Sequence, residues 1–237
     1  MEKSQEEPRR PSALDLLKKQ ADTQPIRESP EAARARMTVE LDQAMRAIDK
    51  YLAEVVSQVN ALEPVVDSTY DLLFIGRIPQ VQLSSGFVDS RPKRIEGRDV
   101  CESLSITYKA RPAAPAGISL FGEEIARCTD HLKNLRLEYT IDVEQKNDFG
   151  QARRAKVSAS AAGSIGCIIN LRADYSGFTA GVELINAGRF GRREARLSVA
   201  QLKTAADDLA RYILGADSDF EKVMAAAKPA GAPPPPR

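Results

Sequence analysis

The chain has few of the side chains that commonly perform chemistry. Among its 237 residues there is no tryptophan and a single histidine, His131, so a Ser-His-Asp or Cys-His arrangement would have one available base. The phosphate-binding patterns GxGxxG and GxxxxGK[ST] are absent, as is the zinc-binding pattern HExxH. No group of carboxylates shares a helix face with the spacing of metal ligands. These absences disfavour an enzyme and predict neither a cofactor nor a metal site.

Cysteine and long apolar runs are scarce as well. Cys101, Cys128 and Cys167 are odd in number and far apart, which is typical of buried thiols in a reducing compartment and not of disulfides or a zinc site. No apolar segment follows the first residues, and nowhere is an apolar run long enough for a membrane span. We therefore expect a cytoplasmic protein that has no signal peptide and does not bind membranes.

Proline and aromatic residues divide the chain into regions. Most of the fourteen prolines lie in the first thirty residues or after Lys228, where there is no aromatic residue to form a core. The sequence thus predicts a disordered tail at 1–29, a long helix at 30–64, an α+β domain at 65–217 and an Ala/Pro-rich tail at 218–237. Within the first tail, Ala13–Leu17 is a short amphipathic segment and a candidate docking motif.

The segment 30–64 is predicted to form one long amphipathic helix. Ser29 suits the N-cap, Pro30 suits the first turn, and Pro64 ends the helix. Apolar residues recur at alternating steps of four and three, which places them on one stripe. The residues of this seam are Leu41, Met45, Ile48, Leu52, Val55, Val59 and Leu62. Such heptads favour a coiled coil and a homo-oligomer, but a helix that lies across a sheet of its own chain would show the same stripe.

Beyond Pro64 the apolar spacing changes to two, which indicates strands. The expected order is about three strands, a helix at 123–135, about five strands and a C-terminal helix that begins with the capping box Ser198–Gln201. We expect Asp89–Asp99 to be a polar connection, Gly163–Gly166 to be a tight hairpin turn, and the strand at 164–173 to be central. The fold class is α+β: a long N-terminal amphipathic helix, then an antiparallel sheet meander with one internal and one C-terminal helix.

Net charge is only +1, so no overall field attracts nucleic acid, and any anion binding must be local. Basic residues do gather in three segments. The candidate anion-binding residues are Arg91, Lys93, Arg94, Arg98, Arg153, Arg154, Arg189, Arg192, Arg193 and Arg196. Guanidinium groups from two of these segments at one edge of the sheet could hold phosphate groups. Interleaved acidic residues argue against nucleic acid, and basic residues on edge strands also serve to prevent aggregation.

Three functional hypotheses follow. The favoured one is a non-enzymatic cytoplasmic interaction or adaptor protein that self-associates through its N-terminal helix and binds a protein partner that the sequence does not identify. The second is a nucleic-acid or anionic-ligand binding module that uses the arginine clusters. The third is a hydrophobic-ligand carrier, because a C-terminal helix after a meander resembles helix-grip folds.

Overall fold

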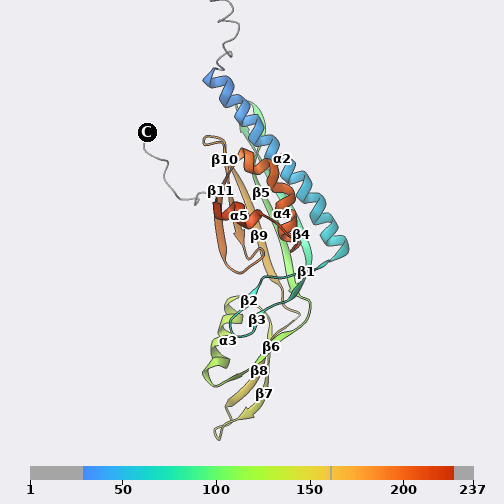
Figure 1. Ribbon diagram of the computed structural model, residues 1–237, viewed down its shortest axis with the longest axis vertical. Coiled ribbons are helices and arrows are strands. Elements are labelled where there is room, and N and C mark those ends of the chain that lie inside the picture. The colour runs from blue at the N-terminus through green and yellow to red at the C-terminus, as the bar shows by residue number, and fades with distance from the viewer. Residues whose placement is uncertain (1–28, 161, 227–237) are drawn as a thin grey trace, which may run out of the picture. The chain divides into compact units, whose positions relative to one another are not determined.

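The computed structural model describes residues 29–160 and 162–226 (Figure 1). Contacts within the chain define two units, residues 1–37 and 38–237, and the second unit contains the fold described here. The candidate docking motif Ala13–Leu17 and the proline-rich end lie outside the described residues, as does almost all of the expected N-terminal tail. Among the described helices, none combines the length and apolar character that a membrane crossing requires.

The long helix forms where the sequence predicts it. Helix α2 spans Pro30–Leu62, and the Ser29 hydroxyl accepts a hydrogen bond from the Ala32 N–H at 3.1 Å, as an N-cap does. The helix ends two residues before Pro64, whose ring cannot continue it. The predicted long N-terminal helix is therefore confirmed, and it ends at Leu62, two residues before the predicted end at 64.

The predicted fold class is also confirmed: the chain is an α+β protein with a large antiparallel sheet. This sheet has six strands in the order β1-β4-β5-β9-β10-β11. Its strands are β1 (Val65–Asp67), β4 (Gln80–Ile95), β5 (Arg98–Pro112), β9 (Ile165–Asp174), β10 (Thr179–Ile185) and β11 (Arg192–Ser198). Strand β9 lies between β5 and β10, so the strand expected to be central is central.

The remaining strands do not join this sheet, so the strands after the long helix are divided between separate sheets. A second sheet has the order β6-β8-β7, and a two-stranded ribbon pairs β2 with β3. These strands are β2 (Asp71–Leu72), β3 (Gly76–Arg77), β6 (Ala116–Phe121), β7 (Tyr139–Lys146) and β8 (Ala152–Ala159). Because β8 and β9 belong to different sheets, Gly163 and Ser164 end a crossover, Ile165 and Gly166 begin β9, and the segment is not a hairpin turn.

The expected polar connection at Asp89–Asp99 is wrong as well. These residues form the far half of a hairpin in which β4 and β5 pair up to Ile95 and Arg98, and Glu96 and Gly97 form the turn with positive φ. This half of the hairpin has little cover, so its side chains are mostly exposed and charged. The composition of the segment therefore resembles that of a loop.

Within the described residues there are three further helices: α3 (Glu123–Asn134), α4 (Val199–Ile213) and α5 (Phe220–Ala226). The predicted capping box is confirmed, since Ser198 and Gln201 cap one another at the start of α4. Helix α5 lies in the segment expected to be a tail, and its Phe220 is fully buried with the ring 5.7 Å from that of Tyr212. The folded region thus extends at least to residue 226.

Helices α2 and α4 lie over one face of the large sheet (Figure 1). Hydrogen bonds connect α2 to the sheet and to α4. The Asp42 carboxylate accepts the N–H of Cys101 on β5 at 2.7 Å, and Tyr51 donates to Asp207 of α4 at 2.9 Å. On the other side of Cys101, Tyr175 donates to the Cys101 carbonyl at 2.8 Å. Cys101 is paired with Pro92, which has no N–H to donate to the Cys101 carbonyl, and Tyr175 supplies a donor to that carbonyl instead.

Candidate binding face of the large sheet

Strand β9 shows how the sequence gives the large sheet two different faces. Ile165, Cys167, Ile169 and Leu171 are buried under the helices, while the residues between them point the opposite way, as a period of two requires. We call the second surface the open face. The side chains that line it are Phe87, Asp89, Arg91, Glu102, Ser103, Ser105, Thr107, Asn170, Arg172, Glu183, Arg192 and Glu194, and they surround an open depression of about 790 Å³.

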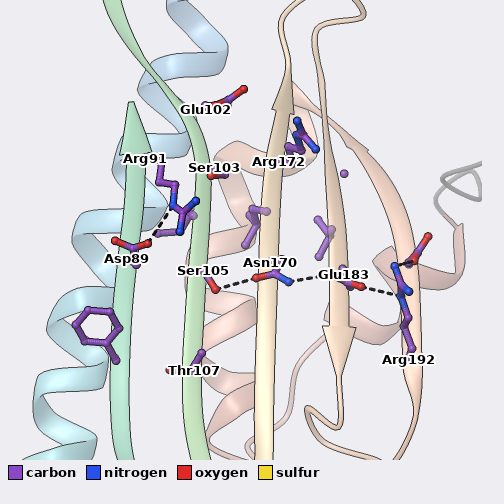
Figure 2. Close-up of a pocket in the computed structure, with 16 residues that line it drawn as sticks. Asp89, Arg91, Glu102, Ser103, Ser105, Thr107, Asn170, Arg172, Glu183 and Arg192 are labelled. Carbon is purple, nitrogen blue, oxygen red and sulfur yellow. Dashed lines mark hydrogen bonds and ion pairs between the residues drawn. The ribbon is translucent and has the colours of Figure 1, made fainter. Parts of the chain in front are cut away.

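A row of hydrogen-bonded side chains crosses the open face (Figure 2). Ser105 donates to the amide oxygen of Asn170 at 2.8 Å, and the Asn170 amide nitrogen donates to Glu183 at 2.7 Å. Arg192 continues the row through Glu183 at 2.7 Å and Glu194 at 2.6 Å. The strand register places Ser105, Asn170 and Glu183 directly opposite one another, so backbone pairing holds this row in place.

The neighbouring row contains three arginines. Register pairs Arg91 with Ser103, Ser103 with Arg172, Arg172 with Gly181, and Gly181 with Arg196. Arg172 is exposed, and its two direct neighbours are too small to cover its guanidinium. Within residues 29–160 and 162–226, no acceptor lies within hydrogen-bonding or ion-pair distance of it. Arg172 is therefore an exposed cation whose donors have no acceptor among the described residues.

The other arginines of this row have acidic partners of their own. Arg91 lies 3.4 Å from Asp89, and Arg196 lies 3.8 Å from Asp174. Asp174 also accepts from the Ser176 hydroxyl at 2.6 Å and from the N–H groups of Ser176 and Gly177. The Ser176 hydroxyl foremost, then these N–H groups and Arg196, lower the pKa of Asp174. This carboxylate fixes the turn between β9 and β10, beside Arg172.

The balance of charge limits what the open face can bind. Three arginines line the depression, together with Asp89, Glu102, Glu183 and Glu194. A polyanion such as nucleic acid would meet these carboxylates along much of its length, whereas one anionic group could reach Arg172 without meeting them. The exposed ring of Phe87 lies at one corner of the same surface.

The structure separates the predicted anion-binding residues. Arg91, Arg192 and Arg196, from two sequence segments, lie on the open face, and Lys93 pairs with Glu102 at 3.6 Å at its margin. The others lie elsewhere. Arg94 and Arg98 are at the turn of the β4–β5 hairpin, Arg153 and Arg154 are on β8, and Arg189 and Arg193 are near the helices, where Arg193 pairs with Glu221. Arg172 was missed because it is a lone charge within the apolar strand β9.

The predicted oligomer seam is largely used within the chain itself. Leu41, Met45, Ile48, Leu52 and Val59 are buried in the core that α2 shares with the sheet, Val55 is half-buried, and Leu62 is 71% exposed. An amphipathic helix that covers its own sheet therefore accounts for the heptad stripe. Apolar surface remains at Tyr51, Val55, Leu62 and Leu214, which line a depression of about 460 Å³.

No catalytic arrangement is visible in the part of the chain that the structure describes. His131 lies on α3 away from the open face, and the three cysteines are buried free thiols, as predicted. Burial raises the pKa of Cys167 to about 11, which keeps this thiol protonated. Residues 29–160 and 162–226 contain no cluster of His, Cys, Asp or Glu able to hold a metal ion.

Fold and site together define an α+β protein with one helix-covered sheet face and one polar face. Comparison with models of protein families, with curated proteins and with solved structures gave no match.

Proposed function

We propose that this chain is a non-enzymatic interaction protein whose open face binds a ligand through a single anionic group, a carboxylate or a phosphate. The observation that supports this most is the exposed guanidinium of Arg172, which has no partner among the described residues and stands between Ser103 and Gly181. Arginine presents a planar fork that matches carboxylate and phosphate oxygens with two parallel hydrogen bonds.

The surroundings of Arg172 support a specific site more than a general charged surface. Asn170 lies two residues before Arg172 on β9 and therefore on the same face. Its side-chain amide is hydrogen-bonded at both ends, by Ser105 and by Glu183. Its polar atoms are thereby fixed in direction before any ligand arrives, which lowers the entropy cost of binding. The hydroxyl of Ser103 adds a donor that turns freely toward an anion.

The alternatives have less support. Nucleic acid would bring many phosphates to a surface that carries four carboxylates. A hydrophobic-ligand carrier needs space between the sheet and α4, where Leu202, Leu209 and Ile213 are buried. Self-association through α2 remains a proposal, with Leu62 as its most exposed seam residue.

A titration followed by amide NMR tests the proposal. Inorganic phosphate, acetate, a phosphoserine peptide and a single-stranded oligonucleotide are added separately to the labelled protein. We expect the amide signals of Ser103, Arg172 and Gly181 to shift with phosphate or acetate. They should also shift with the phosphoserine peptide if the natural ligand is a phosphorylated protein. Strong, steeply salt-dependent binding of the oligonucleotide alone would favour the nucleic-acid hypothesis.

Two variants make the test specific. Arg172→Gln should weaken binding at least about tenfold, or about 1.4 kcal/mol. Arg153→Gln removes an exposed arginine from the small sheet and should leave binding unchanged. Shifts that are absent, or that persist in Arg172→Gln, would rule the site out.

A further inference from the structure

A second depression, of about 580 Å³, lies on the helix-covered face of the large sheet, beside the C-terminal end of α4. We call it the tyrosine pocket, because Tyr70, Tyr108 and Tyr212 line it. Three parts of the chain that are far apart in the sequence form its sides, and these are residues 66–71, 188–189 and several residues between 212 and 222. Its volume is that of a small-molecule site.

Hydrogen bonds hold one side of the tyrosine pocket in place. The carbonyls of residues 186, 187 and 188 accept the hydroxyls of Tyr70 at 2.7 Å, Tyr212 at 2.7 Å and Thr69, in that order. The next residue is Arg189, so the backbone that carries this side chain is fixed before a ligand arrives. A preformed site loses less entropy on binding than a flexible one.

Two charged side chains that line the pocket have no partner in the part of the chain that the structure describes. Arg189 is exposed, and no acceptor lies within hydrogen-bonding or ion-pair distance of its guanidinium. Asp71 is exposed too, and register places it opposite Arg77. The Arg77 Nε, however, donates to the Ser68 carbonyl at 2.6 Å, and no ion pair joins Asp71. Arg189 and Asp71 do not pair with each other either, so a ligand that carries both charges could satisfy both.

The other charged side chains at the pocket already have partners within the chain. They are Glu221, which pairs with Arg193 at 2.7 Å, Lys222, which pairs with Asp219 at 2.5 Å, and Asp67, which accepts from Gln80 at 3.3 Å. Asp219 foremost, and Asp217 after it, raise the pKa of Lys222. Arg189 and Asp71 are therefore the charges with most to gain from a ligand.

The interior of the tyrosine pocket suits an aromatic ring. Tyr70 and Tyr108 are buried, and the apolar side chains of Val81, Leu83 and Ile213 line the same space. None of these five side chains carries a charge. Aromatic and aliphatic side chains favour a ring by burial and by edge or offset contacts.

We propose that the tyrosine pocket binds a small aromatic molecule that carries both a carboxylate and an ammonium, which is the chemistry of an aromatic amino acid. The carboxylate binds the guanidinium of Arg189, the ammonium binds Asp71, and the ring lies on the apolar interior. A ligand with one charge leaves either Arg189 or Asp71 unpaired, and a neutral ring leaves both. The pocket lies on the opposite face of the sheet from Arg172 and does not depend on anion binding there.

Indole fluorescence tests the ligand class. The chain has no tryptophan, so excitation that tyrosine does not absorb reports only the ligand. Tryptophan, tryptamine, indole-3-propionate and indole share one ring system and carry both charges, the ammonium, the carboxylate and neither, respectively. We expect tryptophan to bind most tightly, and removal of either charge to weaken binding at least about threefold, as for an exposed charge pair. Equal affinities for tryptophan and indole, or no binding of tryptophan, would overturn the proposal.

Two substitutions of exposed residues test which side chain binds which charge. Arg189→Gln should weaken binding of tryptophan and indole-3-propionate at least about threefold and leave tryptamine unchanged. Asp71→Asn should weaken binding of tryptophan and tryptamine and leave indole-3-propionate unchanged. Arg153→Gln, which also removes an exposed arginine, is the matched control and should change none of the four. Variants that alter all four probes alike, or none of them, would contradict the proposed contacts.

Amide NMR locates the site. Tryptophan should shift the signals of Gly188, Arg189 and Gly215, and Arg172→Gln should leave these shifts unchanged. Shifts confined to residues of the open face would place the ligand there and overturn this proposal. Phosphate and acetate binding at Arg172 is measured separately, so either proposal can fail alone.

Discussion

The side-chain amide of Asn60, near the end of α2, forms two hydrogen bonds with the backbone of Gly86 on β4. Its oxygen accepts the Gly86 N–H at 2.6 Å, and its nitrogen donates to the Gly86 carbonyl at 2.8 Å. The pairing of β4 with β5 shifts register between Ser84 and Phe87, so the backbone of Gly86 lies in a β-bulge without a ladder partner. The helix thereby supplies the hydrogen bonds that the sheet cannot.

Asn60→Ala should lower the free energy of unfolding by about 1–2 kcal/mol. It removes both hydrogen bonds to the backbone of Gly86, which has no hydrogen-bonding partner on β5. Urea unfolding at neutral pH measures the change. Gln58→Ala, on an exposed position of the same helix, serves as the control and should change stability by less than about 0.5 kcal/mol. Equal effects of the two substitutions would show that the bulge does not depend on this amide.

Gly86→Ala should destabilise the protein for a steric reason. A Cβ at this position would lie 2.8 Å from Cγ1 of Val56 and 3.3 Å from Oδ1 of Asn60. Overpacking of this kind costs about 1–3 kcal/mol. Gly166→Ala is a matched strand substitution with no heavy atom within 4 Å of the added carbon, and it should cost much less. In a double-mutant cycle, Val56→Ala should reduce the cost of Gly86→Ala; purely additive effects would contradict the contact.

Asp174→Asn should make stability less dependent on pH. The folded pKa of this carboxyl is lowered, so the unfolded state binds more protons, and its contribution is present above the unfolded pKa and lost as pH falls through the folded one. At neutral pH we expect a loss of about 1 kcal/mol, discounted for partial exposure. The variant and the wild type should converge once the pH falls below the lowered folded pKa of Asp174. Asp148→Asn, in the exposed β7–β8 turn, is the control, and a gap that persists at low pH would contradict this assignment.

The three thiols should react slowly in the folded protein. Burial raises the pKa values of Cys101, Cys128 and Cys167, in the last case to about 11. Because the thiolate is the reactive form, this shift alone slows Cys167 roughly 100-fold at pH 8. A disulfide reagent should therefore label the native chain slowly and all three cysteines at once in guanidinium. Rapid labelling of native protein would show that the core opens there.

Local patterns in the sequence were enough to predict much of the fold. Residues close together in the sequence were enough to predict the helix caps at Ser29 and Ser198 and the bounds of α3. The run of apolar residues in β9 was enough to predict its central position. The division of strands between two sheets was not predictable in this way, because it depends on which distant strands pair. The charged half of the β4–β5 hairpin was taken for a connection because strands with little cover lack an apolar face.

The candidate site was predictable only in part. The arginine clusters drew attention to Arg91, Arg192 and Arg196, and register brings these onto one face. Arg172 was not found, since a single charge between apolar neighbours forms no cluster in the sequence. The stripe from Leu41 to Leu62 gave the correct helix, but the same pattern serves a coiled coil and a helix packed on its own sheet.

Among the described elements, helix α2 is synthesised first, and its partners on α4 are synthesised much later. Tyr51 donates a hydrogen bond to Asp207, which is 156 residues further along the chain. Glu40 accepts one from Lys203, which is 163 residues further along. During synthesis its apolar stripe would thus emerge from the ribosome long before the sheet and α4 exist to receive it. Folding of this core is therefore completed only after α4 has been synthesised, and until then the apolar stripe of α2 has no sheet or α4 to cover it.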